Sequence, residues 1–302
     1  DVERSRGLGD VYKRQMQATL VVAGCSALPL LYWLGAAAGS LVLLRRGLKD
    51  ALGVLALGVL PALLWWLTFD DPRALLVLLG SSSLALVLRA SESWSRVLLV
   101  SIAMGLVFAG VLGAAFRPQI EALSQELIKI LPMALGEVYQ QLSVEERARL
   151  ATLIAPILTG LIAALLQAIS VLSLILGRYW QAVLYNPGGF GREFRAIRIP
   201  LGPAMLLLAC MLVGPNFGPQ LAMLTPMCSV PLAFAGLALI HGLVAQGRLA
   251  RFWLVGLYVT LLPFMQLIYP LLVVLAIVDS LVDFRGRLAP KDADNGSANG
   301  EG

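Results

Sequence analysis

The chain has few residues of the kinds that bind metals, form crosslinks or carry out acid–base catalysis. It contains one histidine and three cysteines in 302 residues. Cys25, Cys210 and Cys228 are odd in number, widely spaced and set in apolar surroundings, so they indicate neither a disulfide framework nor a metal site. The sequence has no HExxH motif, no Ser/His/Asp arrangement and no paired carboxylates deep in an apolar run. We therefore expect no catalytic residues, no metal and no cofactor, and we interpret the chain as a non-enzyme.

Charged residues are also scarce. They make up 14% of the chain, whereas a soluble domain carries roughly 25%. Hydrophobic residues make up 59% and gather in runs near the ~20 residues that a helix needs to cross a bilayer. This pattern predicts an all-α, polytopic transmembrane helical bundle whose first partner is the lipid bilayer. The net charge of +5 comes from arginines between the apolar runs. Their position favours topology signals over nucleic-acid contacts, and we expect no nucleic-acid partner.

The two ends of the chain differ from the rest. Residues 1–15, DVERSRGLGDVYKRQ, are polar and lack the apolar core of a signal peptide. Because the ending DVYKRQ resembles translated sequencing-adapter read-through, we interpret residues 1–15 as non-native. A single transmembrane domain is expected over residues 16–288. The segment 289–302, rich in Asp, Asn and Gly, is expected to be a disordered polar tail.

Six apolar runs read as membrane spans, and two terminal blocks are ambiguous. The six runs are Leu48–Thr68, Arg73–Leu88, Ser95–Phe116, Ala151–Leu176, Leu201–Val213 and Met227–Val244. The blocks Met16–Leu44 and Phe252–Phe284 could each be one helix, or a hairpin divided near Pro29 or near Pro263 and Pro270. Single helices give about eight spans, and hairpins give up to ten. Hairpins are favoured because they preserve the alternation of basic connections.

The basic connections predict which ends of the spans face the cytoplasm. They contain Arg45, Arg46 and Lys49; Arg89 and Arg96; Arg178 to Arg198; Arg248 and Arg251; and Arg285 and Arg287. The long connection 117–150 falls on the opposite side and is expected to contain one amphipathic helix, lying on the membrane or capping the bundle. Its apolar positions are Ile120, Leu123, Leu127, Ile130, Leu131, Val138 and Leu142. Ser143-Val-Glu-Glu146 matches a capping box, so a new helix should start there. We expect a multi-pass membrane protein.

The stretch NPGGFGREFRAIR, residues 186–198, combines glycines with arginines. It is neither a P-loop nor GxGxxG, because no GK[ST] follows the glycines and Phe190 interrupts their spacing. Asn-Pro and Gly-Gly are turn signals, and arginines at a spacing of three could share a helix face. Three interpretations stay open: a turn, a docking surface for a membrane or cytoplasmic protein, or a site for anions or lipid headgroups. The candidate residues are Asn186, Gly188, Gly189, Arg192, Arg195 and Arg198.

A second group of candidates consists of polar and small residues within the apolar runs. His241 and Asp279 could act together in a proton or ligand role, or Asp279 could pair with nearby arginines. A transport protein should have a polar pocket near Gln167, Ser170 and Ser173, whereas a docking protein should have a packed interior. Gly35 and Gly39 form a small-xxx-small pattern that could pack within the bundle or dock another subunit.

Several longer stretches resemble a known family. PLLYWLGAAAGSLVLLRRGLKDAL, NPGGFGREFRAIR, LIHGLVAQGRLARFW and VDSLVDFRGRL are similar to the YybS-like family of bacterial membrane proteins, over about residues 17–288. The resemblance implies an inner-membrane protein of about eight helices without an assigned activity. The hydropathy is also similar to that of the substrate-binding subunits of energy-coupling-factor transporters, which bind a small solute and dock a partner through small residues on the first helix. The functional hypothesis is a small-solute-binding or transport component, and the alternative is a docking or assembly factor that acts through the basic loops. The small-molecule ligand is left open.

Overall fold

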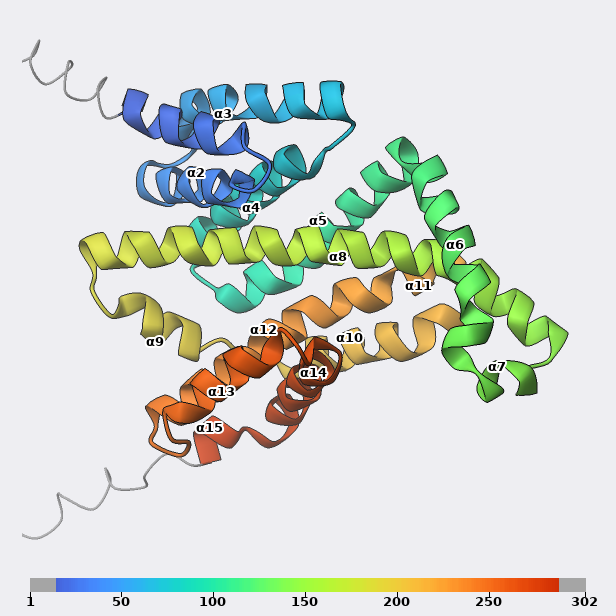
Figure 1. The fold of residues 1–302 in the computed structure, drawn as a ribbon. Coiled ribbons are helices and arrows are strands. Elements are labelled where there is room, and N and C mark those ends of the chain that lie inside the picture. The colour runs from blue at the N-terminus through green and yellow to red at the C-terminus, as the bar shows by residue number, and fades with distance from the viewer. Residues whose placement is uncertain (1–14, 288–302) are drawn as a thin grey trace, which may run out of the picture. The chain divides into compact units, whose positions relative to one another are not determined.

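The computed structural model describes residues 15–287, and every regular element in that range is a helix (Figure 1). The helices are α2 (Tyr32–Arg46), α3 (Leu48–Phe69), α4 (Arg73–Ser91), α5 (Trp94–Ala115), α6 (Arg117–Leu135), α7 (Glu137–Gln141), α8 (Val144–Tyr185), α9 (Gly189–Arg195), α10 (Leu201–Val213), the short 3₁₀ helix η1 (Gly214–Asn216), α11 (Pro219–Ala222), α12 (Leu224–Ala245), α13 (Phe252–Leu261), α14 (Met265–Val282) and α15 (Phe284–Arg287). Residues 15–26 form a further helix before α2. The all-helical prediction is confirmed for this range. The expectations for residues 1–15, apart from Gln15, and for 289–302 lie outside the described residues.

Six helical segments of the described range are long and apolar enough to cross a membrane. They are α3, α4, α5, α8, the segment Pro219–Ala245 that contains α11 and α12, and α14. The helices at Leu201–Asn216 and Phe252–Leu261 are apolar but shorter. These helices are compatible with an integral membrane protein. The expected total of eight to ten spans stays a prediction.

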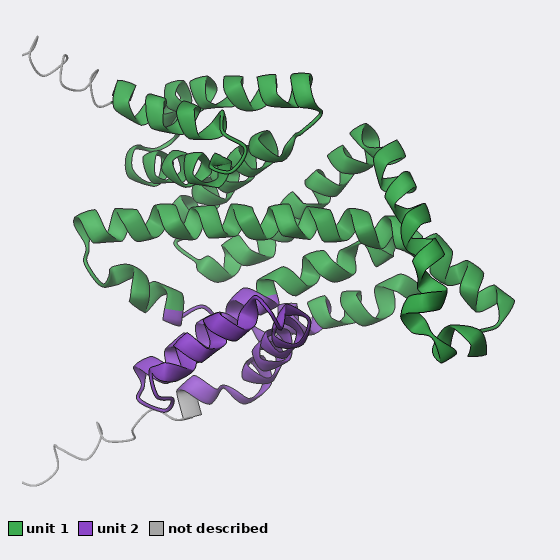
Figure 2. Ribbon diagram, viewed as in Figure 1, with its two compact units in different colours: residues 1–194, 207–231 green, residues 195–206, 232–302 purple. Residues whose placement is uncertain are grey.

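The chain divides into two compact units (Figure 2). Unit 1 contains the residues up to 194 and residues 207–231, and unit 2 contains residues 195–206 and those from 232 onward. The polypeptide passes from one unit to the other at the end of α9 and within α10 and α12.

The N-terminal block of unit 1 is divided, as the hairpin interpretation requires. Its break covers residues 27–31 and includes Pro29, and α2 then runs back along the first helix. A Cβ at Gly35 would lie 2.8 Å from Ser26 Oγ, so the two arms are in close contact. With 15 residues, α2 is about 22 Å long, which is shorter than the ~30 Å apolar layer of a bilayer.

The core of unit 1 is built by α2, α4, α5 and α8, which pack through small residues. A Cβ at Gly177 of α8 would lie 2.6 Å from the Ala37 carbonyl oxygen of α2, so the two backbones nearly touch. Further along both helices, the Arg45 guanidinium lies 4.5 Å from the centre of the Tyr185 ring. These two contacts show that α2 and α8 run parallel. Close backbone approach at glycine is common between helices in membranes, because the hydrophobic effect does not drive helix association in lipid and van der Waals packing must do so.

The turn between α3 and α4 is held by Asp71, which directly precedes Pro72, the N-cap residue of α4. Asp71 accepts a hydrogen bond from the Arg73 backbone N–H at 3.1 Å and forms an ion pair with the Arg73 side chain at 2.6 Å. Partial burial acts to raise the pKa of Asp71, but the hydrogen bonds and charge of Arg73 outweigh it and hold that pKa below its ordinary value. Asp71 is therefore better satisfied as a carboxylate in the folded protein than in the unfolded chain.

The long connection 117–150 contains two helices instead of one. Gly136, with φ of +53°, ends α6 and separates it from α7. The predicted capping box is confirmed: the Ser143 N–H donates to Glu146 Oε2 at 2.7 Å, and the Glu146 N–H donates to Ser143 Oγ at 3.2 Å. The helix that starts there, α8, has 42 residues and continues beyond the predicted end at Leu176.

Unit 2 contains the second ambiguous block, which is also divided. The break at residues 262–264 includes Pro263, whereas Pro270 lies inside α14. Gly236 of α12 faces the α14 backbone so closely that any side chain there would collide with the Leu272 carbonyl.

Candidate functional site

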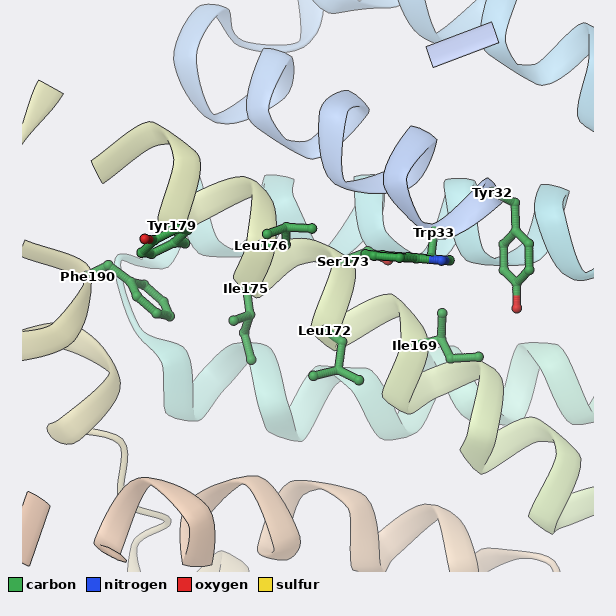
Figure 3. A pocket seen from close by; sticks show the side chains of 9 residues that line it. All are labelled: Tyr32, Trp33, Ile169, Leu172, Ser173, Ile175, Leu176, Tyr179 and Phe190. Carbon is green, nitrogen blue, oxygen red and sulfur yellow. The ribbon is translucent and has the colours of Figure 1, made fainter. Parts of the chain in front are cut away.

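A cavity of about 500 Å³ lies along the second half of α8 in unit 1 (Figure 3). Its lining residues are Tyr32 and Trp33 of α2; Ile169, Leu172, Ser173, Ile175, Leu176 and Tyr179 of α8; and Phe190 of α9. The volume is within the ~300–1,000 Å³ range of small-molecule sites. Ile169 and Tyr179 are ten residues apart, so the cavity extends over about 15 Å of the helix.

The wall of this cavity is apolar and carries few polar groups. The Trp33 indole N–H is already used, since it donates to the Leu30 carbonyl at 2.9 Å. Ser173 is 1% exposed, and its hydroxyl has no hydrogen-bond partner among the described residues. The cavity can therefore accommodate an alkyl chain or ring.

The α9 end of the cavity is fixed by aromatic and ionic contacts within unit 1. The Phe190 ring packs edge-on against Trp94 and Tyr179, with ring centroids 6.2 and 6.1 Å apart. Arg178 donates two hydrogen bonds to the Glu193 carboxylate, one of them at 3.0 Å from Nε to Oε2. These contacts hold the start of α9 against α8, so the Phe190 wall is preformed.

Gln167, predicted as an intramembrane polar residue, lies on α8 inside the packed core. It is 0% exposed, and its Nε2 donates to Ser101 Oγ at 2.8 Å and to the Met227 carbonyl at 3.3 Å. The residue four positions after Met227 is Pro231, which has no N–H with which to bond that carbonyl. Gln167 therefore satisfies a helix carbonyl that a proline leaves free.

The structure of unit 1 shows a packed core around Gln167 and Ser170 in place of the polar pocket expected near Gln167, Ser170 and Ser173. Ser170 is fully buried and donates to the Leu166 carbonyl at 2.8 Å. Of these three residues only Ser173 borders the cavity, and the cavity there is apolar.

In unit 2 the predicted candidate Asp279 is at the centre of an ion-pair cluster. Its side chain is 3% exposed, and its Oδ2 lies 2.7 Å from Arg285 Nη2 and 4.0 Å from Arg198 Nε. Its Oδ1 accepts the Phe284 N–H at 3.2 Å. Arg198 also pairs with Asp283 at 2.9 Å. This is the structural pairing that the sequence allowed for Asp279.

The same cluster ties the segment after α9 to the end of α14. Arg285 donates to the carbonyls of Arg195 and Ile197 at 2.6 and 2.9 Å, and Ser280 Oγ donates to the Ile199 carbonyl at 2.8 Å. A Cβ at Gly242 of α12 would lie 3.2 Å from Arg285 Cδ. Residues 195–199, Gly242 and residues 279–285, which lie far apart in the sequence, thus meet in unit 2.

His241 is placed beside Tyr258. The His241 Nε2 and the Tyr258 hydroxyl are 2.9 Å apart, and the two rings pack edge-on. The imidazole thus has a neutral phenol as its hydrogen-bond partner. The proposed proton or ligand role of His241 with Asp279 stays untested.

The glycine- and arginine-containing stretch is a short turn followed by a helix. Gly188 has φ of +81°, which favours glycine, and a Cβ at Gly189 would lie 2.5 Å from the Asn186 amide nitrogen. Arg192 lies exposed on α9 in unit 1, whereas Arg195 and Arg198 belong to unit 2. Since α9 ends at Arg195, the three arginines do not form one continuous helix face.

Gly35 and Gly39 are both used for packing within the chain. Gly35 faces the first helix, and a Cβ at Gly39 would lie 3.1 Å from Leu55 Cδ2 of α3. Both glycines are buried. Their use by another subunit stays a prediction.

Sequence reasoning missed Tyr32, Trp33, Tyr179, Phe190 and Arg285. Tyr32 and Trp33 lie inside the first apolar block, Tyr179 follows the run that ends at Leu176, and Phe190 lies in the stretch 186–198, so no sequence pattern joins them. Arg285 was counted only as a topology signal. Within residues 15–287 no group of three or more His, Cys, Asp or Glu side chains could hold a metal ion. Searches for a matching protein-family model, a curated protein and a solved structure found none.

Proposed function

We propose that this chain is a multi-pass protein of the bacterial inner membrane that binds a small molecule with a long apolar part, as a solute-binding or transport component. The cavity along α8 carries this proposal. It has the volume of a ligand site, it borders a helix long and apolar enough to cross a membrane, and its wall is apolar. The hydrophobic effect favours an alkyl or ring system in such a site over a polar solute, whose polar groups would lose their hydrogen bonds to water.

Packing of the core around Gln167 supports an apolar ligand over a polar one. The Gln167 amide nitrogen is engaged by Ser101 and by the Met227 carbonyl, so this nitrogen is not available to a solute. A ligand in the cavity would meet side chains of α2, α8 and α9 instead.

A photoactivatable fatty acid carrying a diazirine tests the proposal. The purified full-length protein is irradiated with the probe, and the labelled residues are found by mass spectrometry. Labels should gather on the segment 169–179 and on Phe190, and a tenfold excess of the unlabelled fatty acid should remove most of them. Labelling spread evenly over exposed apolar residues, without competition, would refute the site.

A pair of variants on α8 provides the matched control. Leu172 borders the cavity and is 52% exposed, so Leu172→Trp should fill the cavity without disturbing the core. Leu165 lies two turns earlier, is 57% exposed and does not border the cavity. We expect Leu172→Trp to lose competable labelling severalfold and Leu165→Trp to retain it.

The alternative function, docking or assembly through basic loops, is favoured by the exposed basic residues on the predicted cytoplasmic side. Arg45, Lys49 and Arg192 are all exposed in unit 1. Proteins that copurify in mild detergent can be identified by mass spectrometry. An ATPase pair with a scaffold subunit would favour transport. A partner lost in Arg192→Glu, and retained in Lys129→Glu on the opposite predicted side, would favour docking.

A further inference from the structure

Helix α6 has one face that is covered by its own unit and a second apolar face that is bare. It contacts α5, α7 and α8. Ile120 and Ser124 are buried, and Ile128 and Leu131 are partly buried, which makes a stripe with helical spacing. Leu123, Leu127 and Ile130 make a second stripe, and they are 47%, 40% and 47% exposed. Only about half of the apolar arc of α6 is therefore packed against the rest of unit 1, and the other half is exposed.

The remaining face of α6 is polar. Glu121, Gln125 and Lys129 follow one another at a spacing of four and are all exposed. Two ion pairs lie on the helix surface, Arg117 with Glu121 at 3.0 Å and Lys129 with Glu126 at 2.7 Å. The helix is therefore amphipathic, with a polar face opposite its apolar face.

The position of α6 in unit 1 places it at the end of a membrane span. It begins directly after α5, a helix long and apolar enough to cross a membrane, and Phe116 is the single residue between them. Figure 1 shows α6 crossing α8 steeply instead of running alongside it. In its second half α5 also exposes apolar surface, with Leu106 and Val107 44% and 57% exposed. The bare stripe of α6 therefore follows directly on a candidate membrane span that also exposes apolar side chains.

We propose that α6 is an interfacial anchor that rests in the outer leaflet of the bilayer, with Leu123, Leu127 and Ile130 among the acyl chains and Gln125 and Lys129 in water. A helix with this division of faces binds at the boundary between headgroups and chains. The charges of α6, Arg117 and Lys129 against Glu121 and Glu126, balance. The contact therefore requires no anionic lipid and should form in neutral phosphatidylcholine.

Spin labels at single cysteines test the anchor in the full chain reconstituted in phosphatidylcholine nanodiscs with one protein in each. The background replaces Cys25, Cys210 and Cys228 by alanine, and gel filtration must show a single peak. The test positions are Ile130→Cys and Leu127→Cys, and the matched control is Gln125→Cys on the polar face. Collisions with dissolved oxygen, which concentrates in lipid, are compared with collisions with a water-soluble nickel chelate.

The expected result is a severalfold excess of oxygen over nickel collisions at positions 127 and 130, with the reverse at position 125. Equal and high nickel collisions at all three positions would place the stripe in water and overturn the proposal. Low collisions with both reagents at 127 and 130 would mean that another part of the same chain covers the stripe, which would overturn the proposal. Because each nanodisc holds one chain, a second copy cannot supply that cover.

Discussion

The contact between Gln167 and the Met227 carbonyl leads to a double-mutant prediction. If the amide replaces the hydrogen bond that Pro231 cannot supply, its contribution should depend on that proline. In the wild-type chain, Gln167→Leu leaves the Met227 carbonyl buried and unpaired. In a Pro231→Ala chain the alanine N–H can bond that carbonyl, so the same change at Gln167 should cost much less.

The magnitude follows from the groups that gain or lose partners. A buried polar group left without a partner costs about 1–3 kcal/mol, and a side-chain hydrogen bond inside a membrane protein contributes about 0.6 kcal/mol on average. Gln167→Leu also removes the amide oxygen, which has no partner among the described residues, and leucine has nearly the same volume. We expect a loss of about 1–2 kcal/mol in the wild-type chain and about zero, or a small gain, with Pro231→Ala. The coupling energy between the two sites should be about 1–2 kcal/mol.

Thermal midpoints in detergent, read by fluorescence-detected gel filtration, give the first comparison. A change of 1 kcal/mol shifts the midpoint by about 2–4 °C for a domain of this size. Equal losses from Gln167→Leu with and without Pro231 would refute the reasoning, because the amide would then act independently of the proline. Gln167→Ala adds a cavity to the loss of the amide, so it should cost about 2–5 kcal/mol in the wild-type chain and about 1–2 kcal/mol less with Pro231→Ala.

Three further predictions concern single sites. Gly236→Leu should destabilise the protein by about 3 kcal/mol or more because α14 leaves no room, whereas Gly256→Leu, with nothing within 4 Å, should change the thermal midpoint little. Asp279→Asn should cost about 3–5 kcal/mol because it breaks a buried ion pair, and Asp283→Asn, whose side chain is 41% exposed, less than about 1 kcal/mol; equal midpoints would contradict the cluster. Because the pKa of Asp71 is lowered on folding, its contribution is present above the ordinary aspartate pKa of about 3.9 and is lost as the pH falls below it. Asp71→Asn should remove a pH-dependent contribution of less than about 1 kcal/mol to the free energy of unfolding, so the thermal midpoint should fall less steeply with acid than in the wild type. An unchanged pH profile would argue against the pairing.

The local features of the fold could be predicted because neighbouring residues determine them. The capping box at Ser143 and the breaks near Pro29 and Pro263 each depend on a few adjacent residues. The far end of α8 could not be predicted this way. Arg178 marks the end of the apolar run, but it pairs with Glu193 and the helix continues past it.

The contacts that build the sites join residues far apart in the sequence. Arg285 bonds carbonyls almost 90 positions earlier, and the cavity combines residues from α2, α8 and α9. Spans that are apolar on every side have no periodicity that indicates which face meets which neighbour. The sequence therefore provides the candidates Asp279 and Gln167, and only the three-dimensional arrangement identifies their partners.

The unequal lengths of α2 and α8 have a consequence for the surrounding bilayer. The helices lie side by side and parallel, yet α2 is about 22 Å long and α8 about 63 Å. If α8 crosses a bilayer, α2 therefore reaches through only part of the membrane depth beside it. Hydrophobic mismatch of this kind is relieved by local thinning of the lipid or by tilting of the longer helix, at a cost of a fraction of a kcal/mol for each ångström. The protein should thus favour thinner membranes, and its tilt should increase as the acyl chains around it are shortened.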